Sequence, residues 1–397
     1  MAARTWYPGH MARARRQMQR VLRQVDLVLE VRDARLPFSS GNPDLGSLTV
    51  GKRRLVLLNK SDLADPAASE AALRQLRGGD AAGGGAGGGG GGTVPANPRG
   101  PQALLTCVHQ PKSIKQLLAA ALEACGAGAA RAGVTLLMVA GAPNTGKSHI
   151  INALKQAAKS QGILPGEQAF NRRTVAGNLP GLTRQVQGFQ VCASPEVYVL
   201  DTPGVLQQRI RSEKEALKLS LAGIVKASIV GDDATVAYLI GLLRSEDRHR
   251  RTLEAAAARL RDPTGGRGGG GSGADTGRGR SVQQQHQQQQ QQPQADAGRA
   301  PQQRQLLRIA EALLHAAAED LPAQEWHPGL EDPSSSSGGS GGGALLGADG
   351  QRRLALLLEA LGVDPLGRDP SQRAAALAGV LRAFRSGGLG RWTLDHV

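Results

Sequence analysis

The stretch that decides the fold is Val134-Thr-Leu-Leu-Met-Val-Ala140, followed by Gly141-Ala-Pro-Asn-Thr-Gly-Lys-Ser148. The first seven residues form an apolar run typical of a buried strand, and residues 146–159 have the periodicity of a helix. The eight residues between them fit the pattern G-x-x-x-x-G-K-[ST] in full. Glycines let backbone N–H groups surround phosphate oxygens, and a helix N-terminus adds partial positive charge. The sequence therefore predicts a nucleotide phosphate-binding loop rather than a chance glycine-rich turn.

Within this loop, side chains and backbone have separate predicted roles. Lys147 would reach the β- and γ-phosphates, and the Ser148 hydroxyl would bind Mg²⁺. The remaining predicted nucleotide contacts are Gly141, Asn144, Thr145, Gly146 and His149. His149 replaces a second hydroxyl residue that is common at this position.

A second motif, Asp201-Thr-Pro-Gly204, follows the apolar run 197–200. A carboxylate at a strand end can hold Mg²⁺ through water, and the Gly204 N–H could contact a γ-phosphate. Thr183, in Pro180-Gly-Leu-Thr-Arg184, would complete the Mg²⁺ shell. The alternative interpretation of each segment is a plain surface turn.

The third motif, Asn59-Lys60-Ser61-Asp62, follows the apolar run 54–58. The Asp62 carboxylate can accept hydrogen bonds from guanine N1–H and the N2 amine, which adenine lacks. Lys60 would cover the base with its stem, and Asn59 would join this loop to the phosphate loop. The three motifs together predict a GTP-binding protein.

The motif order is rotated, because Asn59 precedes Gly141 whereas the base motif of an ordinary GTPase comes last. The same sheet can form when the chain enters it at another point. Apolar runs alternating with helical patterns predict an α/β class P-loop GTPase domain with a mostly parallel sheet, followed by a smaller all-α domain. In this arrangement the helical tail would anchor the segment after Gly204 and move with nucleotide state.

The predicted organisation is a basic segment at 1–24, the GTPase domain at 25–210 and the helical domain at 211–397. Low-complexity insertions are expected at 78–100, 263–303 and 331–343. Strands are predicted at 25–31, 54–58, 103–108, 134–140, 189–192 and 197–200. Helices are predicted at 10–24, 146–159, 213–228, 232–261 with a break, 304–320, 351–362 and 371–385.

The chain has 397 residues and a net charge of +15. This charge favours an anionic partner, such as nucleic acid, a membrane surface or an acidic protein, unless it reflects composition alone. Three cysteines without metal-type spacing argue against a disulfide framework and for a reducing compartment. No apolar run approaches the roughly 20 residues of a membrane span. Neither a signal peptide nor a transit peptide is visible.

Four further segments carry a family likeness: Trp6-Tyr-Pro-Gly-His-Met-Ala12, Asp33-Ala-Arg-Leu-Pro37, Ser40-Gly-Asn-Pro43 and Phe384-Arg-Ser-Gly-Gly-Leu-Gly390. Together with the motif order, they resemble the circularly permuted GTPases of the YlqF/RbgA type. The likeness covers residues 4–76 and 103–260 and the end of the chain.

The resemblance implies a GTPase that binds ribosomal RNA and protein and assists assembly of the large ribosomal subunit in an organelle. A mitochondrion is expected, in the matrix or at the inner membrane, with a chloroplast as the alternative. Val205 and Leu206 stand where other GTPases have a catalytic Gln, so intrinsic turnover should be slow and the ribosome should stimulate it. His10 corresponds to a histidine proposed to help hydrolysis, or it only holds the N-terminal loop. Asn144 corresponds to an asparagine that binds K⁺. Thr106 and Cys107 correspond to the loop that supports the base, where Ser-Ala is usual.

Two other functions compete with this one. One is a GTP-dependent RNA-binding scaffold with negligible turnover, which the missing Gln favours. The other is a membrane-associated regulator of organellar translation that binds anionic lipid through residues 13–23.

Overall fold

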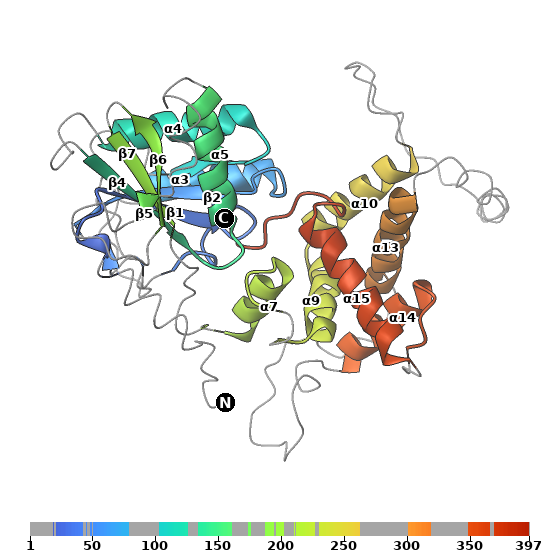
Figure 1. The fold of residues 1–397 in the computed structure, drawn as a ribbon. Coiled ribbons are helices and arrows are strands. Elements are labelled where there is room, and N and C mark those ends of the chain that lie inside the picture. Colours follow the sequence, from blue (N-terminus) through green and yellow to red (C-terminus); the bar gives the residue numbers. More distant parts are fainter. Residues whose placement is uncertain are drawn as a thin grey trace, which may run out of the picture. The chain divides into compact units, whose positions relative to one another are not determined.

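The computed structural model describes residues 19, 21–42, 45, 48–49, 51–78, 103–125, 134–160, 174–175, 187–193, 196–201, 210, 212–226, 230–262, 301–318, 348–365 and 369–396 (Figure 1). These residues form a sheet unit, up to Val230 together with Arg391–His396, and a helical unit from Gly231 to Gly390. Of the predicted insertions, only Gly78 and residues 301–303 are described, and they belong to helices.

One mixed sheet forms the frame of the sheet unit. Its strands are β1 (Leu27–Asp33), β2 (Arg53–Asn59), β3 (Ala103–Leu105), β4 (Val134–Gly141), β5 (Thr174–Val175), β6 (Gln187–Ala193) and β7 (Glu196–Asp201). Their order across the sheet is β3-β2-β1-β4-β7-β6-β5. Strands β3, β2, β1, β4 and β7 are parallel, whereas β5 and β6 pair antiparallel. The predicted mostly parallel α/β sheet is confirmed.

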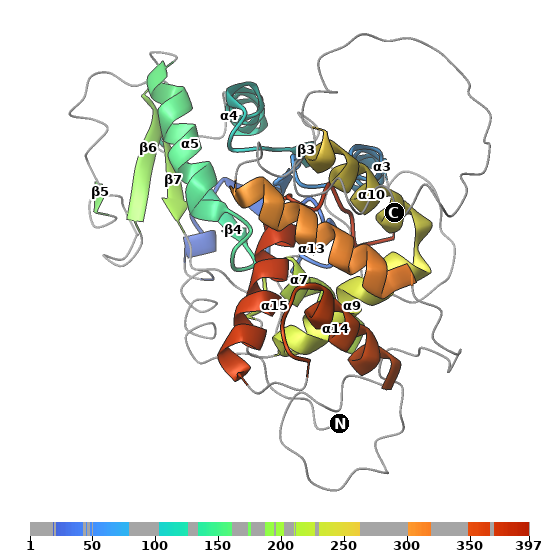
Figure 2. The same ribbon diagram turned by 90° about the vertical axis from the view of Figure 1, so that its right-hand side faces the viewer.

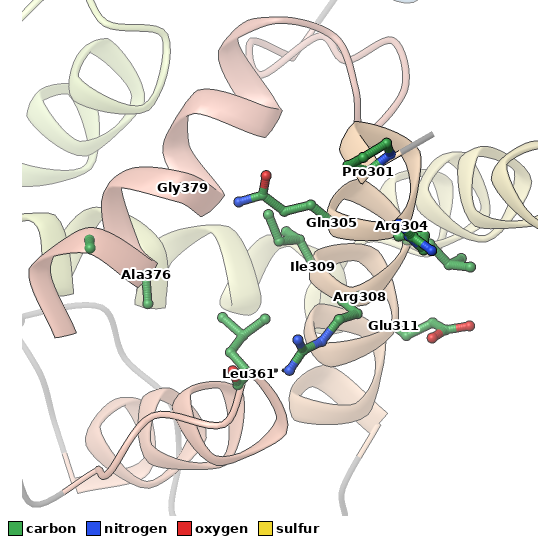
Figure 3. Close-up of a pocket in the computed structure, with 11 residues that line it drawn as sticks. Pro301, Arg304, Gln305, Arg308, Ile309, Glu311, Leu361, Ala376 and Gly379 are labelled. Atoms are coloured by element: carbon green, nitrogen blue, oxygen red, sulfur yellow. Dashed lines mark hydrogen bonds between the residues drawn. The ribbon is translucent and has the colours of Figure 1, made fainter. Parts of the chain in front are cut away.

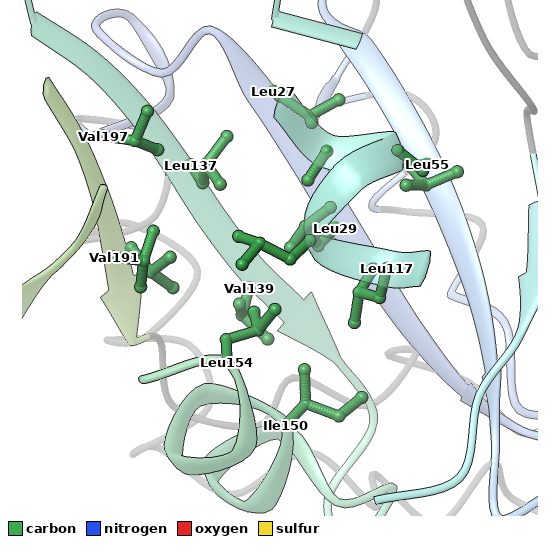
Figure 4. Close-up of a cluster of buried hydrophobic side chains, with 14 of the residues drawn as sticks. Leu27, Leu29, Leu55, Leu117, Leu137, Val139, Ile150, Leu154, Val191 and Val197 are labelled. Atoms are coloured by element: carbon green, nitrogen blue, oxygen red, sulfur yellow. The ribbon is translucent and has the colours of Figure 1, made fainter. Parts of the chain in front are cut away.

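The sheet is buried on both faces, which explains the continuous apolar runs in the sequence. Helices α4 (Pro111–Cys125) and α5 (Lys147–Ser160) cover one face. There Leu29 of β1 and Val139 of β4 pack with Leu117 and Leu154 of these helices (Figure 4). Burying a side chain of this size contributes about 1.5–3 kcal/mol, so this cluster fixes where both helices lie on the sheet.

Helix α3 (Pro66–Gly78) contributes to a second cluster with Val56 and Leu58 of β2. Neither α3 nor α4 was among the predicted helices. Both carry local start signals, because each begins with proline and the Asp65 side chain accepts a hydrogen bond from Ala68 N at 2.8 Å.

Helix α7 (Glu213–Leu221) also belongs to the sheet unit. The Ser212 side chain accepts a hydrogen bond from Glu215 N at 3.1 Å and starts this helix. The predicted helix 213–228 is shorter in the structure because Gly223, with φ +79°, ends it. Ile224 N then bonds to Leu219 O at 2.8 Å, as in glycine-terminated helices.

The helical unit consists, in its described part, of α9 (Asp232–Ser245), α10 (Asp247–Arg261), α13 (Pro301–Ala318), α14 (Ala348–Ala360) and α15 (Pro370–Arg385). Helix α9 is buried along residues 234–243, and it contacts α10, α13, α14 and α15 (Figure 2). The predicted break within 232–261 is confirmed at Glu246, whose backbone is extended.

A hollow of about 560 Å³ lies within the helical unit (Figure 3). Its lining includes Gln305, Arg308, Leu361 and Ala376, from α13, the end of α14 and α15. None of the predicted nucleotide-binding residues lines it, so the candidate site is elsewhere.

The final residues return to the sheet unit. Trp392 is 1% exposed, and its backbone N–H donates to Leu63 O at 3.0 Å. The Asp395 carboxylate accepts from the N–H groups of Phe38 and Ser39 at 2.9 and 2.8 Å. The division therefore differs from the predicted helical domain 211–397, because buried contacts attach both α7 and this end to the sheet.

Candidate functional site

The predicted motifs gather at one edge of the sheet. Strands β1, β2, β4 and β7 are parallel, so their carboxyl ends lie together, and ligands of such sheets bind at that edge. The loops at 60–65, 106–110 and 142–146 all follow strands that end there.

The phosphate loop joins β4 to α5, as predicted. Gly141 has φ +147°, and a Cβ there would lie 2.2 Å from Val31 O, so β1 and β4 can approach only with glycine at this position. Lys147 Nζ donates to Ala142 O at 2.7 Å, and Thr145 Oγ1 donates to the same oxygen at 2.9 Å. The loop thus folds round its own lysine at the N-terminus of α5, an arrangement suited to anionic oxygens.

The base loop begins where β2 ends, at Asn59, which is 1% exposed. Thr106 Oγ1 donates to Asn59 Oδ1 at 3.5 Å, and Ser61 N donates to Thr106 O at 3.2 Å. These bonds tie the loop after β2 to the loop after β3.

The base loop and the phosphate loop are joined directly. Asn59 Nδ2 donates to Thr145 O at 2.8 Å, across 86 residues of chain. Lys60 Nζ donates to Asn144 O at 2.7 Å. The predicted tie through Asn59 is confirmed, and a single ligand can contact both loops.

The half-buried Asp62 lies beside the Cys107 thiol. Burial, together with a hydrogen bond to Asp62, raises the pKa of Cys107. The Cys107 N–H donates to Ser113 Oγ at 3.0 Å. Asp62 therefore adjoins the loop 106–110, as a base-reading carboxylate would require.

The residues predicted to bind metal are only partly described. Ser148 and His149 are exposed on the first turn of α5. Asp201 ends β7 with its backbone paired to Val139 of β4, and its side chain lies outside the described part. His10, Thr183 and Gly204 also lie outside the described residues, as do Val205 and Leu206.

Among the described residues, no three His, Cys, Asp or Glu side chains group as metal ligands. A Mg²⁺ bound with nucleotide does not need such a group, because one or two protein oxygens plus phosphates suffice. The exposed Ser148 hydroxyl at the loop fits this requirement. Asn144 Nδ2 donates to Gly223 O at 2.8 Å, and the expected K⁺ ligation by Asn144 stays a prediction.

A buried ion pair adjoins the base loop, and residue patterns alone gave it no role. Asp33 accepts from Arg35 Nε at 2.9 Å and Nη2 at 2.8 Å, and from Lys60 Nζ at 3.0 Å. Burial opposes ionisation, but Arg35 and Lys60 outweigh it and hold the pKa of Asp33 far below its usual range. Burial likewise opposes the charge of Arg35, whose pKa is nevertheless raised by Asp33. The motif Asp33-Ala-Arg-Leu-Pro37 contains both Asp33 and Arg35, but the contact between Asp33 and Lys60 could not be predicted from the sequence.

In the part of the chain that the structure describes, no helix combines the length and the apolar character needed to span a membrane.

This chain is similar to one described protein family and to several known proteins. Residues 136–250 match the family described as 50S ribosome-binding GTPase. The chain is 37% identical over 238 residues to "Short integuments 2, mitochondrial" of Arabidopsis thaliana, covering 60% of this chain and 56% of that protein. It is 36% identical over 240 residues to mitochondrial ribosome-associated GTPase 1 of Mus musculus, covering 59% and 65%. The chain therefore spans less than two thirds of either relative.

A bacterial relative is matched over more of its length. Ribosome biogenesis GTPase A of Priestia megaterium is 31% identical over 250 residues, covering 60% of this chain and 74% of the bacterial protein. With its rotated motif order and its joined loops, the chain belongs to the circularly permuted, ribosome-associated GTPases of the YlqF/RbgA family.

Proposed function

We propose that this chain binds GTP with Mg²⁺ and hydrolyses it during assembly of the large ribosomal subunit in mitochondria. The observation that most supports this proposal is the hydrogen bond from Asn59 Nδ2 to Thr145 O, which joins the base-reading loop to the phosphate loop. This bond holds the two loops close enough for one nucleotide to contact both.

Each loop has a part in binding. Asp62 accepts hydrogen bonds from the guanine edge and selects guanine over adenine. Lys147 and the N-terminus of α5 stabilise negative charge on the phosphates. Ser148, with Asp201 and Thr183, would hold Mg²⁺, which would further neutralise the phosphate charge.

Hydrolysis is in-line attack by water on the γ-phosphate, with charge stabilised by the loop and its lysine. Val205 and Leu206 cannot orient that water, because their side chains carry no polar group. The intrinsic rate is therefore slow, and a ribosomal particle raises it by adding order or charge. His10 assists the water or holds the N-terminal loop. Asn144 would hold K⁺, which would add positive charge near the phosphates.

The test of the binding site compares fluorescent GDP and ADP in direct titrations. Guanine nucleotide should bind with clear preference, and Lys147→Ala should abolish binding. Equal affinity for both nucleotides would refute the base-site assignment.

Phosphate release, measured with and without large-subunit particles, tests the enzymatic part. Stimulation by the particles is expected, and an unchanged rate would contradict coupling to the ribosome. His10→Ala should slow release, and a rate equal to that of the native chain would leave His10 a structural role only.

The ribosomal partner and the compartment are inferred from relatives. Proteins named as mitochondrial or as ribosome-associated are among them, and the net charge of +15 suits RNA. Sedimentation from organelle extracts with GDP or a non-hydrolysable GTP analogue should place the chain with large-subunit rRNA in the triphosphate state. Co-migration with neither subunit would contradict it. Regulation of organellar translation, association with the inner membrane and a chloroplast location stay predictions.

The apolar Val205 and Leu206 also favour a second candidate, an RNA-binding scaffold that holds GTP without significant turnover. Phosphate release that stays negligible even on large-subunit particles, with GTP binding intact, would support the scaffold instead.

A further inference from the structure

Asp33 lies at the carboxyl end of β1, directly beside Asn59 in register, and its side chain is fully buried. Its Oδ1 accepts from Arg35 N at 3.1 Å and Arg35 Nε at 2.9 Å. Its Oδ2 accepts from Arg35 Nη2 at 2.8 Å and Lys60 Nζ at 3.0 Å. Arg35 alone neutralises the carboxylate and satisfies both oxygens, so the contact with Lys60 is additional to what the buried pair needs.

Lys60 also contacts the phosphate loop. Its Nζ donates to Asn144 O at 2.7 Å in the phosphate loop. Lys60 and Asn144 have φ of 60° and 58°, and no other non-glycine residue in the described part has positive φ. Residues with a Cβ rarely adopt positive φ, and this backbone conformation persists only where the surrounding structure fixes it. The bridge from Asp33 through Lys60 to Asn144 therefore holds two unusual backbone positions together.

We propose that Asp33 is a positioning residue for guanine-nucleotide binding, acting through Lys60. Held at Nζ by a carboxylate and a carbonyl, the side chain of Lys60 has its stem oriented before the base arrives. A free lysine would lose much more rotamer freedom on binding. Fixing a binding group in advance raises affinity by reducing this loss. The inference rests on the proposed guanine-nucleotide site.

A double-mutant cycle with fluorescent GDP tests this role. Asp33→Asn should weaken binding about tenfold, as should Lys60→Met, the scale of one well-placed polar contact. The double variant should be no weaker than Lys60→Met alone, since Asp33 then has no lysine to orient. A merely structural role for Asp33 would instead lower affinity by the same factor in both backgrounds.

Asp26 offers a matched control at the other end of the same strand. It precedes β1 at the opposite end, and its Oδ2 accepts from Leu136 N at 2.9 Å. Asp26→Asn removes one negative charge from the same region of chain but should leave GDP affinity unchanged.

Asp33→Asn leaves Arg35 buried without its carboxylate, so the variant is first checked for cooperative unfolding. If it does not fold, Asp33→Leu combined with Arg35→Met removes both buried charges, a replacement that proteins often tolerate. The same tenfold loss is expected. Native affinity in either folded variant, or a loss that persists with Lys60→Met, would overturn the inference. If the native chain bound no guanine nucleotide, the proposed function would fall and this inference with it.

Discussion

Gly146→Ala is the substitution whose effect the structure specifies most closely. Gly146 has φ +94°, and a Cβ there would lie 2.4 Å from Asn59 Nδ2, the atom that joins the two loops. The backbone strain should cost roughly 1–2 kcal/mol, because L residues disfavour positive φ. Displacing the buried Asn59 amide loses its bond to Thr145 O, which should cost about 1–2 kcal/mol more. The total loss of unfolding free energy should be about 2–4 kcal/mol.

Gly51→Ala is the matched control. Gly51 has φ +76°, yet nothing lies within 4 Å of the position its Cβ would take. It should show the backbone strain alone, about 1–2 kcal/mol. Urea unfolding can be followed by tryptophan fluorescence, since Trp392 is buried in the same unit. The difference between the two variants isolates the collision with Asn59.

The same collision should weaken nucleotide binding. A disturbed Asn59 no longer aligns the base loop with the phosphate loop, so GDP affinity should fall about tenfold for each 1.4 kcal/mol lost from the bound arrangement. Gly51→Ala should bind normally. In an Asn59→Ala background the collision partner is gone, so Gly146→Ala should cost only its backbone strain. Equal losses for Gly146→Ala and Gly51→Ala in both assays would refute the reasoning.

Three further predictions follow from single side chains. Asp62→Asn should weaken GTP binding and improve xanthine nucleotide binding, because an amide donor suits the xanthine C2 carbonyl; unchanged GTP affinity in titrations would remove Asp62 from the base site. Asp395→Asn should lower the unfolding free energy by about 1–3 kcal/mol in urea, since a charged acceptor for the N–H groups of Phe38 and Ser39 is lost; a native midpoint would contradict this. Burial raises the pKa of Cys125 to about 12, so only the unfolded thiol ionises between about pH 9 and 12. Unfolding free energy should therefore fall as pH rises through that range, less so for Cys125→Ala, and a slope common to both would exclude the thiol.

The sequence was sufficient for the elements that carry a strong local pattern. The run 134–140 and the glycines after it could only form a buried strand and a tight loop, and the structure has β4 ending at Gly141. A helix break within 232–261 was also predicted, although its position at Glu246 was not. Helices α3 and α4 were missed although Pro66, Asp65 and Pro111 marked their starts.

Other features depend on contacts between distant residues, which no local pattern encodes. The second partner of Asp33, besides the nearby Arg35, is Lys60, and this contact depends on β1 and β2 pairing in register. The return of the chain end to the sheet depends on Trp392 finding a buried position beside Leu63. The sequence could name the motif Asp33–Pro37 and the last residues, but only the assembled sheet shows what they bind.

The rotated order changes which segment of the site continues into the helical unit, and the structure indicates how that segment is held. Strand β7 ends at Asp201, and α7 follows it within the sheet unit. The carbonyls after α7 accept from Asn144 Nδ2 at 2.8 Å and Arg35 Nη2 at 3.1 Å, and Lys218 within α7 pairs with Asp395 at 3.3 Å. Since hydrogen bonds are lost beyond about 3.5 Å, a shift of α7 by about an ångström would break all three. Any movement that nucleotide imposes on the chain after Asp201 must therefore either leave α7 in place or release the phosphate loop, the Asp33–Arg35 pair and the chain end together.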